Sequence, residues 1–194
     1  QNKKSSPNQT FARELLALFL LGVANYTEAD AEASTAAWTG HTDQWDDELA
    51  PYRWRADWHD ATPKDFLGQR INTDAATGAW PGHGPETISV MLGSGVVPTG
   101  ATNVANRGRP TRDVAAEFLS RKLWTSFATD SAPPSSVLSA MRTALTTTGF
   151  SIRPWVTAML THSDFYTDSV KSGLVRTPVE YVVALMVATE KRSR

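Results

Sequence analysis

The feature that most constrains the fold is a largely apolar run near the start of the chain, Asn-Gln-Thr-Phe-Ala-Arg-Glu-Leu-Leu-Ala-Leu-Phe-Leu-Leu-Gly. Asn8 or Thr10 suits a helix N-cap and Gly22 suits the left-handed residue after a helix end, so the run predicts one helix. Its leucines and phenylalanines cover more than one face. A helix that is apolar on every side must be buried on every side, and the chain's other helices can cover only part of it. We therefore expect an apolar patch around Phe19 and Leu20 that another part of the polypeptide, or a partner, covers.

An ion pair, Arg13 and Glu14, interrupts this run. Helical geometry places Glu14 on the apolar stripe that includes Phe11 and Leu18. A carboxylate there must find donors or a cation, because burying an unpaired charge is costly. We expect both side chains to be largely buried and to contact the segment 59–64 or another ionic side chain.

Start and stop signals predict further helices along most of the chain. Thr27 with Asp30 three residues later resembles a capping box, and Pro178 after Thr177 is a second clear helix start. Further helical segments are predicted at 85–92, 111–125, 134–147 and 154–162. The segment of about 40–84 is instead rich in Trp, Asp, Gly and Pro, with no sustained helical period. The sequence thus predicts a mostly α-helical, irregular multi-helix fold with one loop-rich insert that could hold a pair of strands.

Composition excludes several classes of protein. The 194 residues are enough for one sizeable core, so residues 1–194 are treated as one domain portion. A net charge of −1 gives no basic field and argues against nucleic acid as a partner. No window approaches the length of an apolar membrane span. The absence of cysteine removes disulfides and thiolate chemistry, and nothing in the sequence identifies a cofactor.

The best candidates for chemistry are His59, Asp60 and Lys64. They would supply a base, a carboxylate that orients it and a cation that stabilises developing charge, as hydrolase-type acid–base catalysis requires. Arg13 and Glu14 would complete such a site if the first helix packs beneath the insert. In the alternative, His59 bonds a backbone carbonyl, Asp60 caps the following turn and the ion pair fixes the helix. We favour this structural interpretation slightly, because ionic networks are common in structural roles.

Aromatic residues give a second candidate surface. Tyr52, Trp54 and Trp58 alternate with charged residues, and a period of two predicts an extended segment with these rings on one face. Such a platform can stack on a sugar ring or a cation. Aromatic residues spaced by two belong more often to a core, which is the interpretation we favour. No metal site is predicted, because the histidines lack ligand spacing and the acidic cluster at 43–48 lacks the EF-hand pattern.

Four blocks, in order along the chain, carry a family resemblance. They are Ala-Arg-Glu-Leu…Leu-Gly…Tyr-Thr in 12–27, His-Asp…Pro-Lys…Leu-Gly in 59–68, Ala…Lys-Leu…Phe…Asp…Pro-Pro in 115–134, and Arg-Thr-Pro-Val-Glu in 176–180. Together they resemble the bacterial family called domain of unknown function 1800. Ala17 stands where that family often has an acidic residue, and the stretch 80–109 is longer and richer in glycine than the family pattern. No family role is therefore carried over to Ala17, His83 or Arg107.

The resemblance implies a setting rather than a reaction. Members are typically exported, which implies an extracytoplasmic or secreted protein, and are often encoded beside a protein resembling sulfatases and alkaline phosphatases, which implies a partner. In the family the first block follows a helical N-terminal half, and Gln1 opens this chain without an initiator methionine or signal peptide. We therefore expect a C-terminal portion of a larger polypeptide. The biochemical activity stays unknown: we favour a structural or binding component acting with a partner, over an exported enzyme centred on His59, Asp60 and Lys64.

Overall fold

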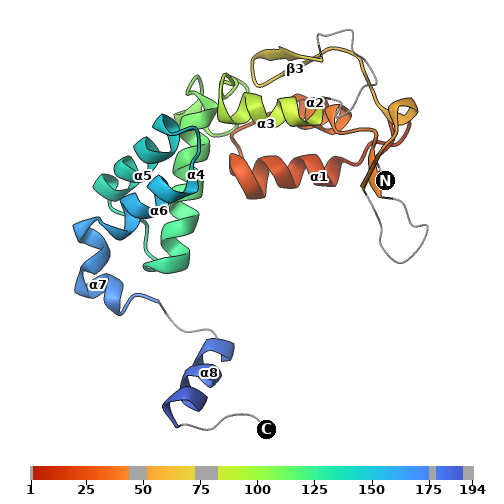
Figure 1. Ribbon diagram of the computed structural model, residues 1–194. Helices are drawn as coiled ribbons and strands as arrows, with labels where there is room; N and C mark the ends of the chain where they lie inside the picture. The colour runs from red at the N-terminus through yellow and green to blue at the C-terminus, as the bar shows by residue number, and fades with distance from the viewer. Residues whose placement is uncertain (1, 44–51, 73–82, 175–177, 190–194) are drawn as a thin grey trace.

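The structure is a computed structural model that describes residues 2–43, 52–72, 83–174 and 178–189. It is mostly helical, with two small two-stranded sheets (Figure 1), so the predicted fold class is confirmed. The helices are α1 (Gln9–Glu14), η1 (Leu15–Leu20), α2 (Glu28–Ala37), α3 (Gly84–Leu92), α4 (Thr111–Phe127), α5 (Ser135–Thr147), α6 (Ile152–Leu160), α7 (Asp168–Lys171) and α8 (Pro178–Ala188), and the 3-10 turns are η2 (Ala56–Trp58), η3 (Val104–Asn106) and η4 (Ser163–Tyr166).

The apolar run at the start of the chain is helical, but it is not one regular α-helix. α1 passes directly into η1, a π-helix after which the N–H of Leu21 donates to the carbonyl of Leu16 at 2.8 Å. Ala12 and Leu16 are fully buried, whereas Leu18 and Phe19 are 52% and 58% exposed. The expected exposed apolar surface is therefore present at Phe19, together with Leu18, but not at Leu20, which is half-buried and packs against the core.

Glu14 does not lie in the core, so this prediction is wrong. The buried stripe runs through Ala12 and Leu16, four residues apart, and Glu14 lies two residues from each, on the opposite side of the helix. Its carboxylate is exposed and has no hydrogen-bond or ion-pair partner within the described ranges. Arg13 is half-buried and pairs with Glu28 of α2, a surface contact of small energetic weight.

α2 begins with the capping box that the sequence predicts. The Thr27 hydroxyl accepts the N–H of Asp30 at 3.3 Å, and the Asp30 carboxylate accepts the N–H of Thr27 at 2.8 Å. The other carboxylate oxygen of Asp30 accepts the N–H of Leu67 at 2.7 Å. Because Asp30 is only 6% exposed, this bond ties the start of α2 to the turn between β3 (Lys64–Phe66) and β4 (Gln69–Ile71).

The insert contains two antiparallel hairpins. β1 (His41–Asp43) pairs with β2 (Tyr52–Trp54), and β3 pairs with β4. The extended segment predicted from Tyr52 to Trp58 is therefore correct only as far as Trp54. Beyond it the N–H of Trp58 donates to the carbonyl of Arg55 at 3.0 Å and closes the turn η2. Trp54 and Trp58 consequently lie on different elements rather than on one face of a strand.

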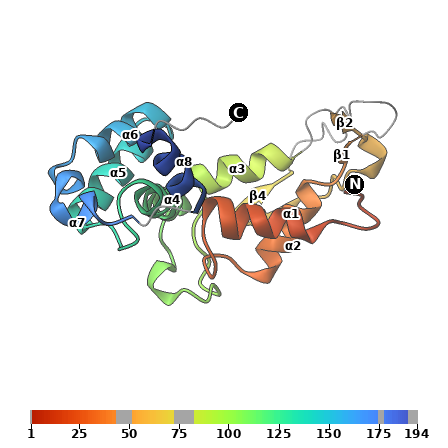
Figure 2. The same cartoon turned by 90° about the horizontal axis from the view of Figure 1, so that it is seen from below.

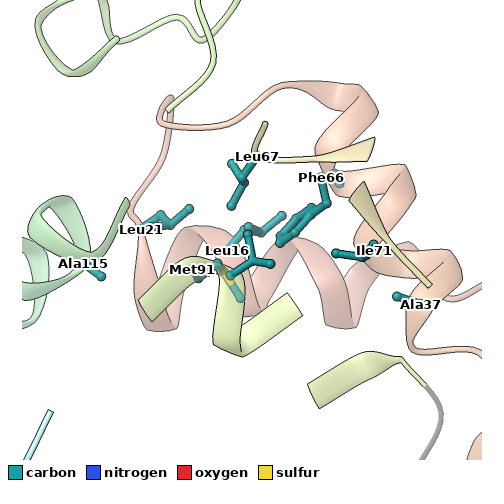
Figure 3. Packing of buried hydrophobic residues seen from close by; sticks show 10 residues of the cluster. Leu16, Leu21, Ala37, Phe66, Leu67, Ile71, Met91 and Ala115 are labelled. Carbon is teal, nitrogen blue, oxygen red and sulfur yellow. The ribbon is translucent and has the colours of Figure 1, made fainter. Parts of the chain in front are cut away.

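In the part of the chain that the structure describes, two large apolar clusters form most of the core, and Val97, Ala101 and Val114 form a smaller third one. The first lies between the N-terminal helices, the β3–β4 hairpin and α3, and Figure 3 labels its largest members. They are Leu16, Leu21, Phe66, Leu67, Ile71 and Met91. The second lies where α5 packs against both α4 and α6, around Trp124 and Met141. α4 supplies Ala115 to the first cluster and Trp124 to the second, so this helix connects the two ends of the molecule (Figure 2).

α8 lies apart from both clusters (Figure 1). Met186 is half-buried, and the other large apolar side chains of this helix are between 52% and 73% exposed. They are Val179, Tyr181, Val182, Val183, Leu185 and Val187. Across the described ranges, no helix combines the length and the apolar character that a membrane crossing requires.

Candidate functional site

His59 follows η2 directly and is only 3% exposed. Its Nδ1 lies 2.8 Å from the carbonyl oxygen of Thr39, and its Nε2 lies 2.8 Å from Nδ1 of His83. A carbonyl oxygen only accepts, so Nδ1 of His59 carries a proton and, in the neutral ring, Nε2 accepts one from His83. Both ring nitrogens of His59 are thus engaged inside the protein, and the predicted bond to a backbone carbonyl is confirmed.

The surroundings of His59 favour its neutral form. Burial lowers the pKa of His59 below its ordinary value, and the electrostatic interactions with His83 and Lys64 lower it further. The hydrogen bond to Thr39 and the charge of Asp60 act in the opposite direction but are outweighed. At neutral pH this side chain is therefore an uncharged imidazole in a polar but enclosed environment.

Asp60 and Lys64 fasten the turn that follows His59. The Asp60 carboxylate accepts the N–H and the hydroxyl of Thr62 at 3.0 and 2.6 Å, so the predicted cap is present. Nζ of Lys64 lies 3.2 Å from the same carboxylate and donates to the carbonyl oxygens of Asp60 and Thr62 at 3.0 and 2.6 Å. The Lys64 side chain is only 10% exposed. Its ammonium group is therefore a second donor, besides the amide of Asn72, to the backbone oxygens of this turn.

Both charged groups of this turn have shifted pKa values. Burial lowers the pKa of Lys64, and the hydrogen bond and charge of Asp60 offset this only in part. Partial burial, the largest single influence on Asp60, raises its pKa, but the hydrogen bonds from Thr62 and Lys64 outweigh burial and the pKa lies below the ordinary value. The pair is thus ionised at neutral pH, with an ammonium group that gives up its proton more readily than a solvated one.

Asn72 closes the far side of the turn. It is 1% exposed, donates from Nδ2 to the Thr62 carbonyl at 3.0 Å, and donates its backbone N–H to the Glu86 carboxylate at 3.0 Å. Its Oδ1 is buried and has no hydrogen-bond partner among the residues that the structure describes. A buried amide oxygen without a donor is costly, and it marks a position that a donor group would stabilise.

His83 is a member of this cluster that the sequence did not indicate. It directly precedes α3 and is 7% exposed. The next residue must be small, because a Cβ on Gly84 would lie 2.5 Å from the ring of Trp38. Trp38 in turn donates from Nε1 to the hydroxyl of Thr87 at 3.0 Å and so holds the start of α3 in place. The separation of His83 from His59 along the chain follows no local motif, so only the folded chain reveals the pair.

A series of ring contacts connects the histidine pair to α1. Neighbouring ring centroids are 4.9 to 5.1 Å apart. In order, the rings belong to Phe11, Trp38, His41, Trp54, His59 and His83. Trp54 therefore packs between two histidines and links the insert to the helices, as the interpretation of this residue as core requires.

The predicted aromatic platform does not form as a shared face. Trp58 stacks against cations of its own chain, with Nζ of Lys3 4.0 Å from the ring centroid and the Arg55 guanidinium 4.8 Å away. The side chain of Tyr52 lies outside the part of the chain that the structure describes. The reason is the turn η2, which takes Trp58 out of line with Trp54.

The cluster thus joins His59, Asp60 and Lys64 of the predicted site to His83 and Asn72. The predicted contribution of Arg13 and Glu14 is wrong: the side-chain partners of Arg13 in the described ranges are Gln9 and Glu28. Within those same ranges, no group of three or more histidine or carboxylate side chains is placed to hold a metal ion. The arrangement can hold and relay a proton between two imidazoles, and it rigidly fixes a turn.

Comparison with known proteins gives a family but no relative of known activity. No curated protein and no solved structure matches the chain. One family model does, and its description is "Protein of unknown function (DUF1800)". Because that match covers residues 1–193, which is essentially the whole chain, the protein belongs to this family.

Proposed function

We propose that this chain is a structural or binding component that acts with a partner polypeptide. The observation that carries the proposal is the surface of α8, where six large apolar side chains are more than half exposed. Leu18 and Phe19 of η1 add a second exposed apolar surface. Exposed apolar patches of this kind mark interaction sites.

The occupant we propose first is an upstream segment of the same polypeptide. The family resemblance places a helical half before the block that contains η1, and a helical segment can cover α8 as well as η1. The second occupant is a separate protein resembling sulfatases and alkaline phosphatases. We also propose an extracytoplasmic or secreted location, which rests on the resemblance alone.

Site-specific photo-cross-linking tests this proposal in the natural, full-length protein. A cross-linking amino acid is placed at Phe19 or at Val183, with Ile152 of α6, a 69% exposed apolar residue, as the matched control. We expect the first two positions to give cross-links to upstream peptides of the same polypeptide or to the sulfatase-like protein, and the control to give none. Absence of any polypeptide cross-link at Phe19 and Val183 would contradict the proposal.

An exported enzyme of the hydrolase type, with acid–base chemistry at His59, Asp60 and Lys64, is the second candidate. Two observations favour this candidate. Nε2 of His59 lies 2.8 Å from Nδ1 of His83 in a buried pair, and burial lowers the pKa of Lys64. Against it, both nitrogens of His59 and the ammonium group of Lys64 already bond protein atoms. His59→Ala and Lys64→Ala distinguish the candidates, because a catalytic role predicts loss of a cellular phenotype at unchanged melting temperature, and a structural role predicts a lower melting temperature.

A further inference from the structure

A pocket of about 310 Å³ opens between the turn that follows η1 and one face of α4. Gly22 and Val23 line it from the turn, and Phe118 and Arg121 line it from the helix. This volume is at the lower end of the range for pockets that hold small organic molecules. The pocket is separate from the His59 cluster and from the surface of α8.

Close packing fixes the aromatic wall of this pocket. Gly22 has a φ of +79°, and a Cβ on it would lie 3.0 Å from the ring of Phe118, so the turn comes as near to α4 as a glycine permits. Lys122, also on α4, donates to the carbonyl of Leu18 at 2.8 Å and holds η1 against the helix. The ring of Phe118 is therefore a preformed wall rather than a freely moving side chain.

A continuous series of hydrogen bonds fixes the polar part of the pocket. Asn25, which is 6% exposed, accepts from the amide of Asn106 at 2.8 Å, and Asn106 accepts from Arg109 at 2.6 Å. Arg109 also donates two hydrogen bonds to the Glu117 carboxylate, at 2.6 and 3.2 Å, and Arg142 of α5 donates a third at 2.9 Å. Three of these residues, Asn25, Asn106 and Glu117, line the pocket. Their polar atoms are thus oriented before any ligand arrives.

The charge of the pocket favours an anion. The single negative charge of Glu117 already faces two guanidinium groups, those of Arg109 and Arg142. Arg121 adds a third cation, and its side chain has no hydrogen-bond or ion-pair partner in the described part of the chain. A guanidinium presents parallel donors that match a carboxylate. The lining of the pocket therefore holds one cation that is available to a ligand, beside a carboxylate whose charge is offset by two guanidinium groups outside the lining.

We propose that this pocket binds a hydroxylated ring compound that carries one carboxylate, of the size of a hexuronate. The carboxylate pairs with Arg121, and the face of the ring packs on Phe118. The hydroxyl groups bond to the fixed amides of Asn25 and Asn106 and to the Glu117 carboxylate. This ligand site is independent of the partner surface proposed above.

Calorimetric titration of the 194-residue chain tests the site, with D-glucuronate as the probe and D-glucose as its uncharged counterpart. We expect saturable binding of glucuronate with a Kd of about 1 mM or below, weakened by added salt, and binding of glucose at least about tenfold weaker. Failure of glucuronate to bind, or equal binding of glucose, would overturn the proposal.

Two variants locate the binding. Arg121→Met removes the cation and is expected to weaken glucuronate binding by at least about tenfold, whereas Arg153→Met removes an exposed arginine from α6 and should leave it unchanged. Val23→Trp places a large side chain at a 73% exposed position on the rim and should abolish binding without disturbing the core. If Arg121→Met and Val23→Trp both keep the wild-type affinity, the ligand binds elsewhere and the proposal is wrong.

Discussion

His59 and His83 share a single proton position between Nε2 and Nδ1, because two N–H groups cannot face each other at 2.8 Å. The other nitrogen of His59 must keep its proton for the Thr39 carbonyl. Charging His59 therefore forces His83 to change its tautomer, and burial already opposes that charge. At the scale of single residues, this pair makes folding sensitive to pH near the ordinary pKa of histidine.

We predict that the free energy of unfolding falls as the pH is lowered through about 6.5. The pKa of His59 is lowered in the folded protein, so the unfolded chain binds the proton first and stability is lost from the unfolded value downward. The limiting slope is about 1.4 kcal/mol per pH unit. Urea titrations between pH 7.5 and pH 5 measure this slope. The carboxylates Asp60 and Glu117 do not contribute to it, because their pKa values are lowered and the stability that they provide is lost only below about pH 4.5.

The variant His59→Asn keeps a donor for the Thr39 carbonyl but does not titrate in this range. It should flatten the pH dependence of the free energy of unfolding. His162 lies outside the cluster, at the start of η4, so His162→Asn should retain the wild-type slope. An unchanged slope in His59→Asn would contradict the assignment to this histidine.

Lys64 has a structural role that a stability measurement can separate from catalysis. Lys64→Met removes three donors from the oxygens of Asp60 and Thr62 in a side chain that is 10% exposed, so we expect a loss of about 1–3 kcal/mol in the free energy of unfolding. Arg70→Met breaks only an exposed pair with Asp65 and should cost less than about 1 kcal/mol. Equal, small effects of the two changes in urea unfolding would refute the structural role.

At the scale of elements, the carboxylate of Asp30 joins the start of α2 to the turn of the β3–β4 hairpin. Thr27→Ala removes only the cap and should cost about 0.5–2 kcal/mol. Asp30→Ala also leaves the buried N–H of Leu67 without an acceptor. We therefore expect it to lower the free energy of unfolding by about 1–3 kcal/mol more than the loss of the cap does. Thermal and urea unfolding of the two variants should rank Asp30→Ala as the less stable, and the reverse order would show that the link to the hairpin contributes little.

The elements that local signals predict are those with caps and sustained periodicity. The helix after Thr27 follows from its capping box, and the helices after Pro110 and Pro134, which have no side-chain cap, follow from the proline at their start, because these signals act within a few residues. The β3–β4 hairpin does not: its turn places Leu67 at a φ of +47°, where glycine or asparagine is expected. Burial of Leu67 in the core and its bond to Asp30 override the local preference.

The candidate site divides in the same way. The turn from His59 to Lys64 was predictable, because its bonds span four residues or fewer. The buried side of α1 and η1 was not, since the run is apolar on several faces and only packing selects Ala12 and Leu16 over Phe11 and Leu18. Contacts set by the fold, such as that between His59 and His83, leave no trace in a single sequence.

At the scale of the whole molecule, the two larger clusters, which α4 joins, leave substantial apolar surface uncovered. α8 contributes no side chain to either cluster, and its described side chains are half-buried or exposed. The surface of η1 around Phe19 is similarly exposed. Since exposed apolar area is unfavourable in water, molecules of the 194-residue chain can lower their free energy by covering these surfaces with one another when no partner is present.

We predict that the 194-residue chain self-associates and that α8 is responsible. In sedimentation velocity, the wild-type coefficient should rise with concentration, and the double change Val182→Glu with Leu185→Glu should reduce that rise, because it places two charges on one face of α8. Both side chains are more than half exposed, so the melting temperature should change by less than about 2 °C. Ile152→Glu puts one such charge on an exposed apolar position of α6 and should leave association as in the wild type. A wild-type chain that stays monomeric at every concentration would show that α8 is stable in water without cover, and the partner surface would then have no physical basis.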